Sequence, residues 1–339
     1  MIRFYCPRCA ALVFFDSNSC EICKIRLVFN PAALRFEQLG ESSNSASGRV
    51  NLCRNGSDYG VCNWLAEQAA HGTLCYGCSF NRTIPNLTRN ANIERWKIIE
   101  EAKKRLLFSI IRLGLSIRNG WEHPDTGLLF DFLEDKRCSP AAESPFVTTG
   151  FFEGVITLNI LEADPAMRFA QQKAAKEVYR TVIGHLRHEI GHYFYSLCSG
   201  KNELNEKLAI FFGDSSIDYA KALNRFYLKG PMHDWTDNYI TPYASAHPLE
   251  DWAETFGHYL HIHDALETAA SYQLINKPID KISFDQKISD WRSISIGFNE
   301  LNRSMGLSDA YPFVISERVA EKLRVVDDVI RFLKMKGPD

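Results

Sequence analysis

The sequence predicts an α+β protein, in which small cysteine-rich modules precede a mainly helical domain with a small β-sheet. Three observations predict this class. Eight of the ten cysteines lie before residue 80. From residue 92 onward, apolar residues recur at three- and four-residue steps, the period of an amphipathic helix. Between residues 120 and 162, β-prone segments interrupt the helical patterns.

The composition is that of an ordinary water-soluble protein. The chain has 339 residues, of which 45% are hydrophobic and 24% charged, and its mean hydropathy is −0.21. It has no run of about 20 apolar residues and no secretory signal, so we expect a cytoplasmic protein without membrane contact. The formal net charge of −2 argues against a protein whose main task is to coat nucleic acid.

Residues 1–35 contain two Cys-x-x-Cys pairs, formed by Cys6, Cys9, Cys20 and Cys23. In the cytosol such thiols stay reduced, and two facing pairs offer the four thiolates that zinc binds in a closed structural site. A redox motif would need one pair alone. We therefore predict a zinc ribbon with strands near residues 12–15 and 27–29, which could also contact protein or nucleic acid.

Residues 50–90 contain a second four-cysteine set, Cys53, Cys62, Cys75 and Cys78. The number of ligands fits a second structural zinc, but the first two cysteines lack the knuckle spacing, so His71 could replace one of them or two thiols could be free. The small polar residues 41–48 are the expected linker. Cys138 and Cys198 stand alone, and we expect both to be core thiols.

The pattern of apolar residues assigns 91–339 to one domain with a helical C-terminal tail. Strands are expected at residues 128–133 and 154–160. Helices are expected at residues 93–113, 164–197 with an interruption, 203–212, 215–228, 248–270 and 315–335.

The most informative motif is His188-Glu189-Ile190-Gly191-His192, which lies inside a helical segment. Two histidines four residues apart share one helix face and can bind one zinc ion, and the adjacent glutamate can act as a general base. Apolar residues on both sides of the motif indicate a buried helix, in which polar side chains need partners. The motif therefore predicts a catalytic zinc site with His188 and His192 as ligands and Glu189 as the base.

A catalytic zinc needs a third protein ligand and one open position. We expect Glu250 to be this ligand, ahead of Glu254, His247 or His258. Glu254, one helical turn further on, would accept the N–H of a zinc-bound histidine. Tyr243 could donate a hydrogen bond to the oxyanion of the reaction, although plain packing fits its spacing nearly as well.

With these residues assembled, the chain resembles the bacterial family of zinc-ribbon-containing zinc-binding metallopeptidases. The likeness is carried by the first Cys-Pro-Arg-Cys knuckle and by residues 81–87, 154–159, 187–193 and 244–254. The C-terminal part of the motif, a tyrosine followed by two glutamates four residues apart, is also similar to the gluzincin arrangement of lethal-factor-type toxin proteases. This resemblance implies a zincin-like fold, with Tyr243 as the transition-state donor, Glu250 as the third ligand and Glu254 as the residue that orients a histidine.

We therefore expect a zinc-dependent metallopeptidase with one catalytic and two structural zinc ions and a peptide or protein substrate. The zinc would lower the pKa of its water, and Glu189 would pass the proton to the leaving amine. The strand at 154–160 could hold an extended peptide by strand addition.

Two alternatives remain open at this point. One is a zinc-ribbon adaptor that binds nucleic acid or protein and has a non-catalytic metal site. The other is a zinc amidase or isopeptidase, in which the same chemistry acts on a different bond. Glu189 favours an enzyme over the adaptor, because a structural site has no use for that carboxylate.

Overall fold

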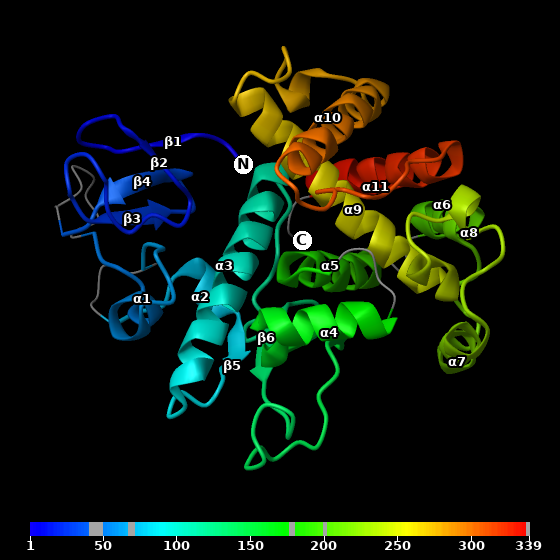
Figure 1. Cartoon of the computed structure of the whole chain (residues 1–339), viewed down its shortest axis with the longest axis horizontal. Helices are drawn as coiled ribbons and strands as arrows, with labels where there is room; N and C mark the ends of the chain where they lie inside the picture. The colour runs from blue at the N-terminus through cyan, green and yellow to red at the C-terminus, as the bar shows by residue number, and fades with distance from the viewer. Residues whose placement is uncertain (41–49, 67–71, 176–179, 199–201, 337–339) are drawn as a thin grey trace. The chain divides into compact units, whose positions relative to one another are not determined.

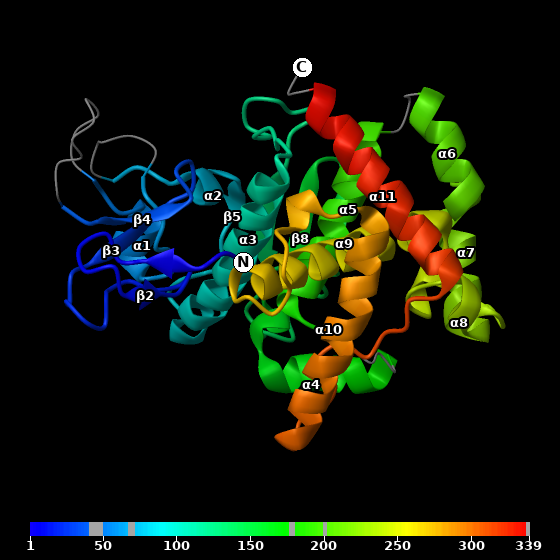
Figure 2. The ribbon, with the colours of Figure 1, turned by 90° about the horizontal axis from the view of Figure 1, so that it is seen from above.

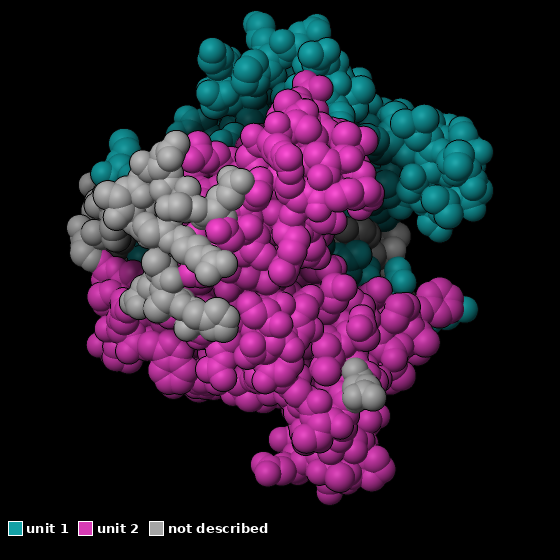
Figure 3. All heavy atoms as spheres, turned by 90° about the vertical axis from the view of Figure 1, so that its left-hand side faces the viewer, with its two compact units in different colours: residues 1, 111–116, 171–339 teal, residues 2–110, 117–170 magenta. Residues whose placement is uncertain are grey.

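The computed structural model describes residues 1–40, 50–66, 72–175, 180–198 and 202–336. The expected linker at 41–48 and His71 lie outside these residues. The chain divides into two compact units, which are coloured separately in Figure 3: residues 2–110 with 117–170, and residues 111–116 with 171–339 and Met1. Within the described residues, no helix is both long enough and apolar enough to cross a membrane.

The unit of residues 2–110 and 117–170 begins with two antiparallel hairpins, followed by two short helices. The hairpins and helices are β1 (Phe4–Tyr5), β2 (Leu12–Val13), β3 (Leu27–Asn30), β4 (Arg35–Gln38), α1 (Arg54–Tyr59) and α2 (Tyr76–Ser79). The strand expected at 27–29 is present, whereas the one expected at 12–15 ends at Val13, and each has a partner strand that the sequence analysis did not identify.

An aromatic core joins the cysteine-rich modules to the long helix α3 (Asn90–Leu113). The ring centroid of Phe108 on α3 lies 5.8 Å from that of Phe4 and 5.2 Å from that of Phe15. Lys104 of the same helix donates a hydrogen bond of 2.8 Å to the buried Asn63. Because α3 completes this core, residues 91–110 cluster with the N-terminal modules, whereas the sequence analysis assigned them to the domain 91–339.

The same unit contains a four-stranded sheet of order β5-β6-β8-β7. Strands β5, β6 and β8 run parallel, and β7 is antiparallel at one edge. The bounds are β5 (Asn81–Thr83), β6 (Leu129–Leu133), β7 (Gly150–Phe152) and β8 (Val155–Asn159), with the 3-10 turn η1 (Ile160–Ala163) after β8.

β8 is an interior strand. β6 pairs with all five of its residues on one side, and β7 pairs with Val155, Ile156 and Thr157 on the other. Beyond β7, the N–H of Asn159 donates to Oγ1 of Thr149 at 3.2 Å. The hypothesis that the strand at 154–160 holds a peptide by strand addition is therefore wrong, because both of its edges are already occupied.

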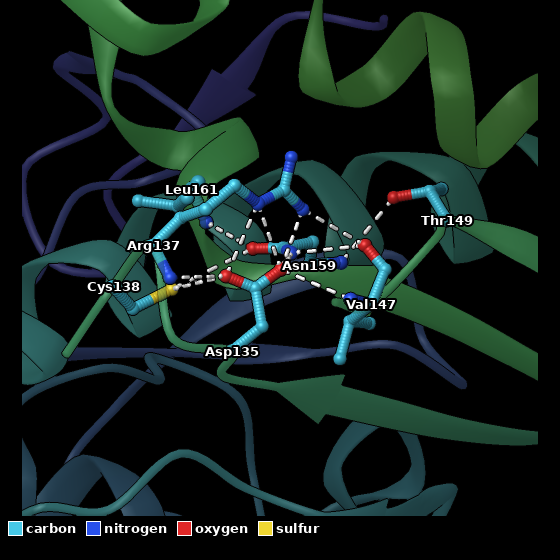
Figure 4. A network of polar contacts seen from close by, with 7 residues as sticks. All are labelled: Asp135, Arg137, Cys138, Val147, Thr149, Asn159 and Leu161. Atoms are coloured by element: carbon cyan, nitrogen blue, oxygen red, sulfur yellow. Dashed lines mark hydrogen bonds and ion pairs between the residues drawn. The ribbon is translucent and has the colours of Figure 1, made fainter. Parts of the chain in front are cut away.

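A polar network around Asp135, just after β6, holds the loop that leads to β7 (Figure 4). Arg137 forms a 2.5 Å ion pair with Asp135, and Nδ2 of Asn159 donates to it at 2.6 Å. Burial opposes the charge, but these donors keep the pKa of Asp135 well below its usual range. Cys138 lies half-buried in this network, 3.7 Å from Oδ1 of Asn159, so the expectation of a core thiol is wrong for Cys138 and confirmed for the fully buried Cys198.

The unit of residues 111–116 and 171–339 is helical. Helix α4 (Pro165–Ala175) begins in the other unit, and its last residues belong to this one. Its elements are α5 (Val182–Cys198), α6 (Asn202–Phe212), α7 (Tyr219–Lys229), α8 (Trp235–Asn238), η2 (Tyr243–Ala246), α9 (Pro248–Ser271), η3 (Ile279–Lys281), α10 (Phe284–Ser304) and α11 (Glu317–Lys336). Most expected helices are found within two residues of their bounds, but α7 begins four residues later than expected. The sequence analysis gave no bounds for α10, which buries only three of its residues.

Helices α5 and α9 lie side by side (Figures 1 and 2). Nε1 of Trp252 on α9 donates to the carbonyl of Gly191 on α5 at 2.8 Å. A Cβ atom at Gly191 would lie 3.0 Å from the Cα of Ala253, so glycine permits this close approach of the two backbones. One turn away, Arg187 forms a buried ion pair with Asp264 across the same two helices. This packing brings side chains of both helices to one point.

Candidate metal centres and active site

The two cysteine pairs of the N-terminal ribbon form similar knuckles. Each closes with a residue in the left-handed region, Ala10 with φ of 56° and Lys24 with φ of 59°. The N–H of each donates to the carbonyl of the first cysteine of its pair, at 3.0 and 2.9 Å. The chain therefore turns back at both pairs and directs their thiols to a common centre.

The sulfur atoms of Cys6, Cys9, Cys20 and Cys23 all lie within 4.8 Å of one another, and two of their separations are 3.6 Å. A tetrahedral zinc with bonds of about 2.3 Å places its sulfur ligands about 3.8 Å apart. The backbone N–H of Cys23 lowers the pKa of the Cys20 thiol to about 6, whereas in the same cluster the N–H of Ala11 is outweighed by burial and by the neighbouring thiols, which raise the pKa of the Cys9 thiol. The four sulfur atoms fit a structural zinc site.

The second set of cysteines also forms one cluster, and all four are buried. Helix α1 folds the chain back between Cys53 and Cys62, and a Cβ atom at Gly56 would lie 2.1 Å from the Cys62 carbonyl oxygen. The sulfur of Cys75, at the start of α2, accepts a hydrogen bond from the N–H of Cys78. The predicted cluster of Cys53, Cys62, Cys75 and Cys78 is thus confirmed, and α1 explains its long first spacing.

The HExxH motif lies on α5, and its ligand atoms converge with a carboxylate of α9. Nε2 of His188 and Nε2 of His192 are 3.2 Å apart. The carboxylate of Glu250, with 1% of its side chain exposed, has one oxygen 3.1 Å from His188 and the other 3.5 Å from His192. Ligand atoms around a tetrahedral zinc with bonds of about 2.0–2.1 Å lie about 3.3 Å apart. The structure therefore brings Glu250 to the two histidines in a geometry that fits zinc.

The charges around these donors favour a cation. Burial alone would keep His188 neutral, but Glu250 and Glu254 raise its pKa well above the usual value. Nδ1 of His188 lies 2.6 Å from Oε1 of Glu254, and Thr241 donates to the other oxygen of Glu254 at 2.7 Å. Glu254 thus takes the predicted place behind the first histidine, and Thr241 is a partner that the sequence analysis missed.

The alternative histidine ligands are engaged elsewhere. His247 is the N-cap of α9: its Nδ1 accepts from the N–H of Leu249 at 3.0 Å, and its Nε2 lies 3.1 Å from the carbonyl oxygen of Ile217. Nδ1 of His258 is 2.7 Å from the hydroxyl of Tyr311. Neither imidazole is among the groups that converge on His188.

Two tyrosines lie at the site. The Tyr243 ring is centred 6.0 Å from the His188 ring, and burial together with Glu250 raises its pKa well above the usual value. The hydroxyl of Tyr219, the first residue of α7, donates to Oε1 of Glu250 at 2.7 Å. Tyr219 was missed because nothing in the local sequence connects it with Glu250, and only the folding of α7 brings the two together.

Glu189 completes the group. Its carboxylate lies within 4.8 Å of the ligand nitrogens of His188 and His192, and 7% of the residue is exposed. Two imidazoles, a ligand carboxylate and a second carboxylate beside them are the donor set of a metal centre that can also move a proton. Fold and site together define a zinc-ribbon protein with an HExxH metal centre.

The chain belongs to the family described as "Putative zinc-binding metallo-peptidase", whose family model matches residues 92–329. The model of a zinc-ribbon domain matches residues 3–89. The resemblance to zinc-ribbon-containing zinc-binding metallopeptidases that was noted from the sequence is thereby confirmed.

The chain is also 37% identical, over 338 residues, to three mycobacterial proteins, with 97% of this chain and 95% of each relative covered. They are the uncharacterized proteins Mb2598c of Mycobacterium bovis, and MT2644 and Rv2568c of Mycobacterium tuberculosis. No solved structure matches the chain.

Proposed function

We propose that this protein is a zinc-dependent peptidase that hydrolyses peptide bonds, with Glu189 as its general base. The observation that carries the proposal is the position of Glu189, a largely buried carboxylate within 4.8 Å of the two histidine nitrogens. A closed structural site would have no use for a second carboxylate at this point.

His188, His192 and Glu250 would hold the zinc. When bound, zinc supplies a Lewis acid that polarises the scissile carbonyl and acidifies water. Glu189 takes the proton of the attacking water and returns it to the nitrogen of the leaving amine. The Tyr243 hydroxyl stays protonated because its pKa is raised, so it can donate a hydrogen bond to the carbonyl oxygen as negative charge develops there.

The test combines a zinc count with a peptide-cleavage assay. Elemental analysis should find three zinc ions per chain in the wild type and one fewer in Glu250→Ala, because Glu250 belongs to one of the three proposed sites. A mixed peptide library analysed by mass spectrometry should show cleavage by the wild type, a loss of at least about 100-fold in Glu189→Gln, and no change in Glu206→Gln, an exposed glutamate of α6. Removal of the zinc with a chelator should stop cleavage, and added zinc should restore it.

The other outcomes separate the alternatives. Full zinc content with no cleavage of any peptide would overturn the proposal in favour of the adaptor. Cleavage of side-chain amide or isopeptide substrates alone would replace it with an amidase or isopeptidase. An equal zinc content in the wild type and in Glu250→Ala would show that the ligand set is wrong.

A further inference from the structure

The two oxygens of Glu250 have different surroundings. Oε2 is the oxygen 3.1 Å from Nε2 of His188. Oε1 accepts the 2.7 Å hydrogen bond from Tyr219 and lies 3.5 Å from His192. A hydrogen bond from a neutral hydroxyl to a carboxylate is charge-assisted and therefore strong. It engages Oε1, the oxygen on the side of His192, and leaves Oε2 free to face His188.

The helix that supplies this hydroxyl is weakly anchored. None of the 11 residues of α7 is buried. The helix contacts η2 through Phe226, whose ring is centred 5.6 Å from that of Tyr243, and through Arg225, which donates to the carbonyl of Ser245 at 3.4 Å. Since α7 buries no residue, its start is tied to α9 by the hydrogen bond of Tyr219 to Glu250 and by the contact of the Tyr219 ring with that of His247, whose centroids lie 5.0 Å apart.

We propose that Tyr219 is a positioning residue that holds Glu250 as a single-oxygen metal ligand and thereby couples α7 to the metal centre. This rests on the ligand set of the proposed function. When the Tyr219 hydroxyl donates its hydrogen bond to Oε1, Oε2 is the oxygen of Glu250 that remains to bind the metal ion. By thermodynamic reciprocity, a metal ion that holds Glu250 in this orientation also stabilises the Tyr219 bond and therefore the position of α7.

The proposal gives the two tyrosines different roles. Tyr219 acts on metal affinity through Glu250, whereas Tyr243 would act on the substrate carbonyl. Loss of the Tyr219 hydroxyl should therefore weaken zinc binding, and loss of the Tyr243 hydroxyl should lower turnover at full zinc occupancy.

The experiment measures zinc affinity by competition with a chromophoric chelator, for the zinc ion that is absent in His192→Ala. Tyr219→Phe should bind this zinc about 10–100-fold more weakly than the wild type, the usual effect of removing a group that orients a ligand. Tyr227→Phe is the matched control, because Tyr227 lies on the same helix with 71% of its surface exposed, and it should bind zinc like the wild type. In the cobalt-substituted protein, the visible spectrum of Tyr219→Phe should differ from those of the wild type and Tyr227→Phe.

Hydrogen exchange supplies a readout that needs no variant. Zinc should slow exchange of the α7 amides in the wild type, and should slow it less in Tyr219→Phe. The proposal would be overturned if Tyr219→Phe bound zinc as tightly as the wild type. It would also be overturned if zinc did not change the exchange rate of the α7 amides in the wild type. A protein that shows both expected effects but cleaves no peptide would refute the proposed function and leave the role of Tyr219 standing.

Discussion

Nδ1 of His188 donates a hydrogen bond to Glu254, and Nε2 of the same ring faces Glu250 at 3.1 Å. Because the first nitrogen is committed to Glu254, the second is the nitrogen that faces the site and would give its lone pair to a metal ion. Thr241 donates to the other oxygen of Glu254 and so fixes the carboxylate in turn. The His188 ring is thus oriented by Glu254 directly and by Thr241 through Glu254, two side chains from different parts of the chain.

Removal of this support should weaken metal binding without removing a ligand. Glu254→Ala should lower zinc affinity at the HExxH site about 10–100-fold, because the His188 ring loses the acceptor that sets its orientation. Thr241→Val should lower it less, since Glu254 remains. Competition with a chelator measures both changes, and Glu206→Ala serves as a surface control. Equal affinities for Glu254→Ala and the control would show that Glu254 has no such role.

The close contact at Gly191 should tolerate no added methyl group. Gly191→Ala places a Cβ atom 3.0 Å from the backbone of α9, so we expect a loss of about 1–3 kcal/mol in the free energy of unfolding. Gly297→Ala in α10 is the matched control, because the added Cβ meets no atom within 4 Å. This substitution should raise the free energy of unfolding by about 0.5–1 kcal/mol, since alanine has the higher helix propensity. Urea unfolding measures both, and a stabilised Gly191→Ala would contradict the packing described.

The buried His258 should make the protein less stable in acid. Burial lowers its pKa to about 4, whereas a histidine in the unfolded chain titrates near about 6.5. Between these values the unfolded chain binds more protons, so stability is fully present above pH of about 6.5 and falls as the pH drops toward 4. From pH 7.5 to 5, this single group contributes a loss of about 2 kcal/mol.

The comparison of wild type with His258→Gln isolates this contribution, because all other titrating groups are shared. Urea unfolding at the two pH values should show a smaller acid loss in the variant, by about 2 kcal/mol. An identical acid loss in both proteins would show that His258 is not kept neutral by the fold.

The grouping of the candidate metal ligands was the most predictable part of the molecule. The two histidines share a helix face, and Glu250 and Glu254 lie one turn apart on another helix, so their spacing alone places them on defined faces. The cysteine pairs were equally informative, because each knuckle is a local turn. These features depend on residues that are close in the sequence.

The contacts that the sequence did not reveal are tertiary. The hydrogen bond of Tyr219 to Glu250 joins residues 31 positions apart and depends on where α7 packs. The interior position of β8 depends on β7, which is three residues long and carries little pattern. The bounds of α10 were missed because only three of its residues face the core. Similarly, α3 clusters with the N-terminal modules through the ring of Phe108, which contacts the distant rings of Phe4 and Phe15.

The approach of α5 and α9 at Gly191 also bears on how related sequences should be searched. In the pattern HExxH, the two middle positions are written as free. In this fold the second of them lies against a neighbouring backbone, and its carbonyl receives the Trp252 indole. For chains built in this way the informative pattern is therefore HExGH, paired with a tryptophan two residues after the glutamate that faces the two histidines.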